Sequence, residues 1–574
     1  MIFPVKFGPL KAAAAASALF AGVAAAQTPV AVETLGGADT FSLGLLSQEQ
    51  GALPPTLWRG GEARVVAYLL ERAPARGESP ALADLLRRTL LTPGAAPAGA
   101  GPELMGAKLE ALVRAGFGAE ARALVNLNAG LAGEAPAARA LASADLLDGD
   151  QRTACLRGAD LGAGLEEAYW LSLRAFCYAA AGEPAAAELT LGLLRERGAP
   201  DPVADALLSG LILNADPGLQ LIETPLHYAI AKTAGMELSD LTLARADAGV
   251  LAALAKDQTA DLDLRLFAAF RAYGMRALSS SDLDSLLQSV PFETSDVAAL
   301  LSTKSVDGTL RGFAAAHQAL ASLPNTLAPL TPPAAEGGDA APLAMAPVDL
   351  DAQIAGQADK AALLAATLAA ARDPMVFLSL AELNAAGVKA LIVDETLADH
   401  GVIFARALMA AGDAEKAARW LSFTGGDARA RLDARILLYA LDPVLSASLG
   451  DNANDLYAER LANMRDGAAE GADFGLSIAE KTALSVFSGA GALLDDEEAT
   501  FANLPTPPFA LRAIADSAVS GGRLGEAALG AIAMSNAAYD AISLLNRAGI
   551  EAEARRVAFD YIGAAQMMAA AVGE

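Results

Sequence analysis

The sequence has few of the residue types on which catalytic and metal sites usually depend. It contains two cysteines and three histidines among 574 residues. His227, His317 and His400 lie far apart, and none has a second His or a Cys at the spacing of metal ligands. We therefore expect each at a helix surface or as a hydrogen-bonded core residue, and assign no metal ligand.

Motifs of familiar enzymes are also missing. We find no Gly-x-Ser-x-Gly elbow, no Walker loop and no Gly-x-Gly-x-x-Gly after a strand. The acidic stretches 145–150 and 495–500 lack the alternation of a calcium loop. A catalytic site needs a base or nucleophile with supporting partners, and none can be nominated. We expect a non-catalytic protein without a cofactor.

Acidic residues outnumber basic residues in this sequence. The chain has 42 Lys and Arg against 68 Asp and Glu, which gives a net charge of −26. Such a chain repels phosphate backbones and anionic lipid surfaces, so nucleic-acid binding is not expected. The longest uncharged stretch, 312–335, contains four prolines, which excludes a spanning helix there. No direct membrane insertion is expected.

The sequence has few of the patterns that are typical of β-strands. Apolar residues make up 54% of the chain and aromatics 5%. Much of the apolar fraction is alanine, the strongest helix former, whereas alternating β-branched or aromatic runs are scarce. An all-α fold is predicted.

The first 26 residues have the pattern of a cleaved secretory signal. Lys6 and Lys11 form a positive start, the apolar stretch 12–26 follows, and Ala24–Ala26 offers a small-residue cleavage site before Gln27. An alanine-rich helix of the fold or an uncleaved anchor is the alternative, although the stretch is short for a span. We expect export to the periplasm.

A hinge of Gly, four residues and Ala recurs between helical stretches. Gly closes one helix in the left-handed conformation that it adopts cheaply, and Ala one turn later lets the two helices approach. The first three hinges are 33 residues apart. The hinge glycines are Gly116, Gly149, Gly182, Gly412, Gly522 and Gly549.

The repeated unit resembles a degenerate tetratricopeptide repeat, whose period is close to 34 residues. In the unit of Gly182, Ala175, Tyr178 and Ala187 match the family pattern, but Trp170 sits one position early. The unit of Gly412 keeps Ala405, Ala417 and Leu421 and lacks the Trp, and the unit of Gly116 has Leu109 where a small residue is expected. The resemblance covers about a third of the chain. It implies an α-solenoid of stacked hairpins that binds proteins.

The chain also resembles long, alanine-rich exported proteins of alphaproteobacteria to which no activity is assigned. The stretches LPPTLWRGGEARVVAYLLERAP (53–74) and TPLHYAIAKTAG (224–235) carry this likeness. This likeness suggests the group of bacteria from which the chain comes, but it suggests no function.

Composition divides the chain into segments. After the signal, 27–50 has few helix signals and is expected to be an extended lead-in. A helical-repeat block spans 51–322 and a second spans 348–574. The Pro-, Gly- and Ala-rich stretch 323–347 is expected to connect them. Alternatively it is a surface loop within one continuous solenoid.

The two cysteines fall on helices that are neighbours in the sequence. Cys155 follows the hinge at Gly149 and Cys177 precedes the hinge at Gly182. A single Cys pair in an exported chain favours a disulfide. Two buried free thiols are the alternative.

Taken together, these patterns predict a periplasmic scaffold or adaptor that binds protein partners of the cell envelope. A chaperone-like or delivery protein would use the same surface transiently. An envelope enzyme or enzyme relic is the other alternative, because some lytic transglycosylases carry an alanine-rich helical superhelix before a catalytic domain. This chain has no candidate for that domain.

Overall fold

The structure is a computed structural model that describes most of the chain after residue 38. The described residues are 39–73, 79–158, 161, 166–198, 201–323, 350–423, 427–452, 454–456, 458–459, 462 and 507–572. The predicted signal peptide, 1–26, and residues 324–347 of the predicted connector lie outside them. The predicted division into two blocks therefore stays a prediction.

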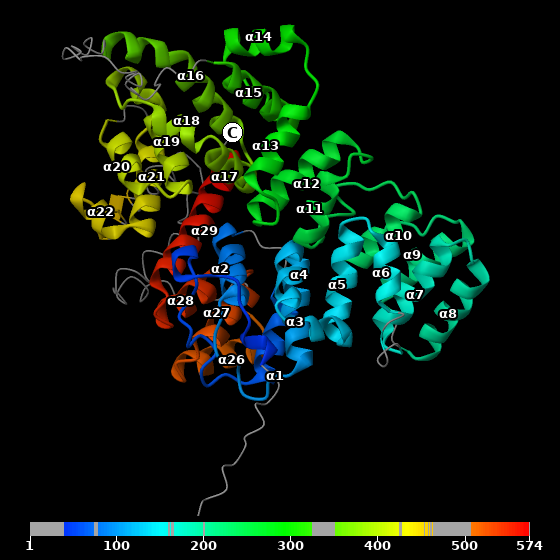
Figure 1. The fold of residues 1–574 in the computed structure, drawn as a ribbon. Helices are drawn as coiled ribbons and strands as arrows, with labels where there is room; N and C mark the ends of the chain where they lie inside the picture. The colour runs from blue at the N-terminus through cyan, green and yellow to red at the C-terminus, as the bar shows by residue number, and fades with distance from the viewer. Residues whose placement is uncertain are drawn as a thin grey trace, which may run out of the picture. The chain divides into compact units, whose positions relative to one another are not determined.

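The described residues are helical (Figure 1). They contain no β-strand, only an isolated bridge between Glu62 and Ala98. The predicted all-α class is confirmed for this part of the chain. The helices before residue 324 are α1 (Ala63–Arg72), α2 (Pro80–Leu91), α3 (Pro102–Arg114), α4 (Gly118–Asn126), α5 (Ala135–Leu147), α6 (Gln151–Arg157), α7 (Ala168–Ala180), α8 (Pro184–Glu196), α9 (Pro202–Leu213), α10 (Pro225–Thr233), α11 (Ala248–Lys256), α12 (Leu262–Gly274), α13 (Ser280–Ser289), α14 (Thr294–Thr303) and α15 (Leu310–Ser322).

The described chain after residue 349 is also helical. They are α16 (Leu350–Ala370), α17 (Pro374–Leu383), α18 (Ala385–Ala390), α19 (Gly401–Ala410), α20 (Ala414–Phe423), α21 (Ala428–Leu441), α22 (Pro443–Ser448), α26 (Phe509–Ser520), α27 (Leu524–Ala533), α28 (Ala538–Arg547) and α29 (Glu551–Val572). Short 3₁₀ helices lie at η1 (Thr40–Ser42), η2 (Gln48–Gln50), η3 (Ala129–Gly133) and η4 (Glu395–His400).

Each of the six predicted hinges joins two helices that pack on each other. All six glycines have a positive φ, between 64° and 90°. The turns share one hydrogen-bond pattern. At Gly182, for example, the Gly182 N–H donates to Ala179 O over 3.1 Å, and the Glu183 N–H donates to Tyr178 O over 2.8 Å. This is the Schellman pattern, in which glycine supplies the left-handed residue.

The alanine that follows each hinge is buried. The six residues are at most 1% exposed, and they are Ala121, Ala154, Ala187, Ala417, Ala527 and Ala554. A larger side chain at these sites would push the second helix away from its neighbour. In each of these hairpins glycine forms the turn and a buried alanine allows the two helices to lie close together.

Helices α10 and α11 cover the first helices of the early hairpins. α10 packs against α5 and α7, and α11 packs against α3 and α5. A Cβ at Gly249 of α11 would lie 2.5 Å from Val113 O, so the glycine permits this close approach. Arg114 and the buried Asp247 add an ion pair with Nε 3.0 Å from Oδ2. The face that these first helices could offer a partner is thus partly occupied by the chain itself.

The first and last helices of the described chain are joined directly. α1 and α2 pack on α27, and α2 also packs on α29; Figure 1 shows them in blue and in orange to red. Gly525 N donates to Leu57 O over 2.8 Å. A Cβ on Gly525 would meet the Trp58 ring at 2.5 Å. Arg88 pairs with Glu553 at 2.8 Å.

A buried carboxylate completes this contact. Asp560 of α29 is 7% exposed. It accepts hydrogen bonds from Ser79 Oγ at 2.5 Å and from the Ala81 N–H at 2.9 Å. It thereby caps the N-terminus of α2 from a distant part of the chain. Burial raises the pKa of Asp560 to about 6, against the lowering effect of these hydrogen bonds.

The described part of the predicted lead-in, 39–50, contains the short helices η1 and η2 and is anchored to α3. Phe41 is 1% exposed. The buried Lys108 side chain donates from Nζ to Phe41 O at 3.0 Å and to Leu43 O at 2.7 Å. Burial lowers the pKa of Lys108 to about 7. A segment held in this way is more closely packed than its composition suggests.

We expect Gly182→Val to destabilise the protein by about 1–3 kcal/mol, the range of a single strained backbone position. A Cβ at Gly182 would meet no other atom within 4 Å, so the cost comes from φ 77° and not from a clash. Gly192→Val is the matched control, because Gly192 is helical and equally open. Thermal unfolding measures both variants. Equal midpoints for the two would contradict the prediction.

We also expect the contribution of Asp560 to the free energy of unfolding to fall as the pH rises from about 4 to about 6. The folded Asp560 keeps its proton over this range while the unfolded chain has lost it, so deprotonation costs about 3 kcal/mol on folding. Asp560→Asn keeps an acceptor for Ser79 and Ala81 but cannot ionise. Its thermal midpoint at pH 7.5 should equal or exceed that of the wild type, with a flatter pH profile between 4 and 6. A lower midpoint with an unchanged profile would refute this role.

Candidate functional site

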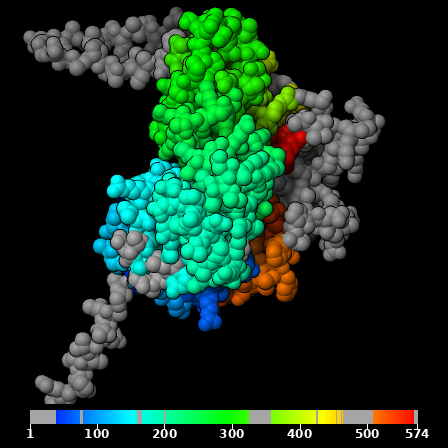
Figure 2. Space-filling model, turned by 90° about the vertical axis from the view of Figure 1, so that its right-hand side faces the viewer, coloured from blue at the N-terminus to red at the C-terminus, as the bar shows by residue number. Residues whose placement is uncertain are grey.

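Two adjoining pockets lie between the early hairpins and the helices that cover them. The first has a volume of about 580 Å³ and lies at the hinge ends of α3–α4 and α5–α6, facing α10 and α11. The second, of about 780 Å³, lies between the end of α10, α11, α12 and the start of α15. Tyr228, Lys232 and Asp257 line both pockets. We call the two together the binding groove. Figure 2 faces the middle part of the chain, whose cyan and green residues cover most of that side.

Small residues form much of the first pocket, because helix ends and close helix contacts meet there. Half of the lining is glycine or alanine: Gly116, Gly118, Ala119, Ala144, Gly149, Ala229, Gly249, Ala252, Ala253 and Ala277. Such a surface leaves backbone atoms accessible and the space between helices open. The hinges that allow the helices to pack thus also create the hollow.

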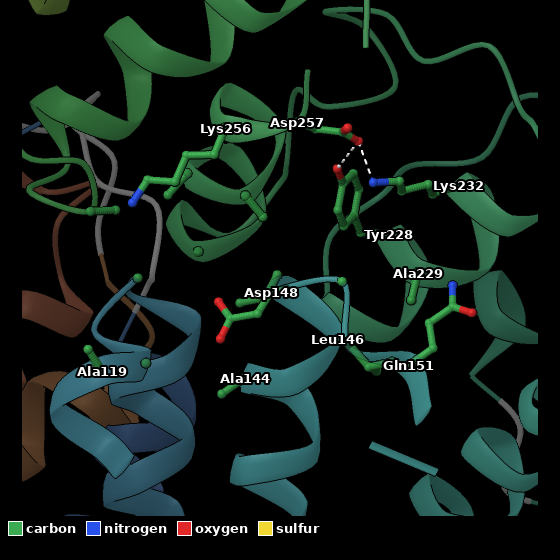
Figure 3. A pocket seen from close by; sticks show the side chains of 18 of the residues that line it. Ala119, Ala144, Leu146, Asp148, Gln151, Tyr228, Ala229, Lys232, Lys256 and Asp257 are labelled. Carbon is green, nitrogen blue, oxygen red and sulfur yellow. Dashed lines mark hydrogen bonds and ion pairs between the residues drawn. The ribbon is translucent and has the colours of Figure 1, made fainter. Parts of the chain in front are cut away.

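Charged side chains of both signs stand at its rim. Asp148 and Lys256 come from opposite walls of the pocket (Figure 3). Asp148 pairs with Arg122 at 2.7 Å, and Lys256 pairs with Asp282 at 3.0 Å. Lys256 ends α11, where the helix dipole favours a cation. The rim therefore carries charges of both signs, each held in an ion pair within the protein.

A hydrogen-bonded cluster separates the two pockets. Lys232 Nζ lies 2.6 Å from Asp257 Oδ2, and the Tyr228 hydroxyl donates to the same oxygen over 3.3 Å (Figure 3). Although burial opposes it, hydrogen bonds from Lys232 and Thr259 hold the pKa of Asp257 at about 2. Burial and the nearby Asp257 raise the pKa of Tyr228. Asp257 is thus fixed as an anion, and Tyr228 remains a hydrogen-bond donor.

A third, smaller pocket of about 220 Å³ contains His227, Asp201, Ser143, Ser172 and Tyr169 in its wall. Both ring nitrogens of His227 are occupied. Nδ1 accepts from the Glu223 N–H at 3.4 Å, and Nε2 lies 2.7 Å from Asp201 Oδ2. The hydrogen bond from His227 is the main cause that lowers the pKa of Asp201. No ring nitrogen is left to activate a serine, so this constellation does not form a catalytic triad.

The other residues considered for chemistry have local partners. His317 Nε2 lies 2.7 Å from Asp284 Oδ1, and His400 packs edge-on to Phe404 with ring centroids 5.9 Å apart. Asp145, in the acidic stretch 145–150, pairs with Arg122 and Arg157. The stretch 495–500 lies outside the described residues. Within the described part of the chain, no group of three or more His, Cys, Asp or Glu is placed to hold a metal ion.

The two cysteines are brought together. Cys155 of α6 and Cys177 of α7 form a disulfide with their Cα atoms 6.0 Å apart. The hairpins α3–α4 and α5–α6 are in extensive contact, because α3 and α5 pack along each other. The next hairpin, α7–α8, contacts α5–α6 mainly where α6 touches α7. The disulfide therefore links α6 and α7 at a place where these two hairpins have few other contacts.

In comparisons with family models, curated proteins and solved structures, nothing matched this chain. No helix among the described residues is long and apolar enough to cross a membrane.

The residues of the groove were not predicted from the sequence. The hinges Gly116 and Gly149 were identified as turns, but nothing in their spacing places them opposite Tyr228 or Lys256. The stretch 224–235, which contains Tyr228 and Lys232, stood out only as a likeness to other proteins. An ion pair between Lys232 and Asp257 has no local signal, because the two residues belong to different segments of the chain.

We expect non-reducing peptide mapping of protein from the exported fraction to yield one linked peptide with Cys155 and Cys177. The bridge closes a segment with a sequence separation of 22, so its loss should destabilise by about 3 kcal/mol on the chain-entropy model. The Cys155→Ser/Cys177→Ser variant should lower the thermal midpoint, and reductant should lower that of the wild type alone. Two freely alkylated thiols would refute the bridge.

Proposed function

We propose that the protein is a non-catalytic scaffold or adaptor of the periplasm that binds envelope proteins in the groove. In this proposal the signal 1–26 directs export, and tetratricopeptide-like hairpins form an α-solenoid in two blocks joined by 323–347. The observation that carries the proposal is the pair of adjoining pockets with Tyr228, Lys232 and Asp257 in common.

Three features of the groove support binding over catalysis. Its volumes, about 580 and 780 Å³, suit several side chains of a partner. The charged groups at the centre of the lining are engaged in ion pairs, Lys232 with Asp257 and Asp148 with Arg122, and not in the pairing of a base with a nucleophile that catalysis needs. The alanine and glycine surface of the first pocket lets a polypeptide backbone approach closely.

The test fills the first pocket. Ala119 is an exposed residue in the first turn of α4 and lines that pocket. Ala119→Trp should block it. Ala185→Trp is the matched control, because Ala185 is the second residue of α8, as Ala119 is of α4, and is also exposed but lies outside the pockets.

Affinity purification from envelope fractions compares these variants with the wild type. The wild type and Ala185→Trp should retain one partner at fixed stoichiometry, and Ala119→Trp should lose it. A spread of substoichiometric clients would instead indicate a chaperone-like role. Equal capture by both variants, or no capture by the wild type, would overturn the proposal.

A further inference from the structure

The second pocket of the groove has an apolar floor. Leu254 of α11 is buried, while Leu264 and Phe267 of α12 and Leu310 of α15 are half-buried. Met236 and Leu238, in the connection after α10, complete the lining from the other side. A floor of this kind favours large apolar side chains, because their burial removes apolar surface from water.

The rim of the same pocket is acidic. Five carboxylates line it and one basic residue, Lys232, does so. Asp257 pairs with Lys232 and Asp263 with Arg311. The other three, Glu237, Asp240 and Asp261, are exposed. None of them forms an ion pair within 4.0 Å of another described residue, although Asp261 is near enough to Arg311 to help raise its pKa.

We propose that this pocket binds a cationic amphipathic segment of a partner protein, with lysine or arginine at the rim and large apolar residues on the floor. Charge complementarity selects the occupant, because Glu237, Asp240 and Asp261 offer three negative charges outside the ion pairs of the rim. An acidic segment would be repelled there. The inference rests on the proposed function and adds the chemistry of the partner.

The probes are fluorescein-labelled decapeptides. One alternates lysine with leucine, a second alternates lysine with serine, and a third alternates glutamate with leucine. The lysine–leucine peptide should bind the mature protein more tightly than the other two by at least about tenfold, since only it satisfies both rim and floor. Fluorescence anisotropy measures each Kd, and raised salt should weaken the binding.

Two charge-matched triple variants separate the pocket from the overall acidity. Glu237→Gln/Asp240→Asn/Asp261→Asn removes the negative charges of the three rim carboxylates that form no ion pair. The asparagine side chain at position 261 can still cap α12. Glu188→Gln/Glu196→Gln/Asp216→Asn removes three exposed carboxylates elsewhere. The first should raise the Kd of the lysine–leucine peptide about tenfold, and the second by less than about twofold. Thermal midpoints check that both variants fold.

A floor variant tests the apolar part separately. Leu238→Ser should weaken binding of the lysine–leucine peptide and leave the lysine–serine peptide unaffected. Equal losses in the two triple variants would show attraction by net charge alone and overturn the inference. So would tighter binding of the glutamate peptide, or no binding of the lysine–leucine peptide.

The envelope partner distinguishes this failure from failure of the proposed function. If Ala119→Trp loses the partner while Glu237→Gln/Asp240→Asn/Asp261→Asn retains it, the groove binds proteins and the cationic assignment is wrong. If the wild type captures no partner, the proposed function itself fails.

Discussion

The close approach of paired helices is the constraint on which this fold depends. Glycine reverses the chain in a left-handed turn, and a buried alanine five residues later keeps the two backbones near each other. With so few aromatic residues, the core cannot rely on large side chains to fill wide spaces. Small residues at short helix–helix distances give the packing density that an interior requires.

The same constraint explains where the groove lies. α10 and α11 occupy the face of the first helices in the early hairpins, and Gly249 lets α11 approach α3. Space therefore remains at the hinge ends, where Gly149 carries no side chain and a Cβ added to it would meet no atom within 4 Å. Two charged residues of the rim follow from helix termini: Lys256 ends α11, where the dipole favours a cation, and Asp261 caps the N-terminus of α12.

Local signals in the sequence were sufficient for the hairpins and insufficient for their assembly. Gly182 and Ala187 mark a turn and a contact within one short segment, so spacing alone revealed them. Arg276 adopts the same left-handed turn, with φ 63°, and was missed because the residue is not glycine. Its guanidinium binds Glu382 of α17 with two hydrogen bonds, 2.5 and 2.6 Å long. That partner lies 106 residues away in the chain, so no local pattern predicts it, and the same holds for the Lys232–Asp257 pair in the groove.

The contact between the first and last helices sets an order on folding. The carboxylate that caps α2 lies 481 positions after Ser79 in the chain. A ribosome makes the N-terminus first, so α1 and α2 can pack on α3 early, but the faces that they turn to α27 and α29 remain uncovered until almost the whole chain has emerged. The apolar residues on these faces stay exposed to water during that interval. The nascent protein then depends on other molecules to cover these residues and prevent aggregation. The native state is thus reached only after synthesis is nearly complete, and loss of the last helix would remove a packing partner from α2, near the start of the sequence, as well as from α21 and α28.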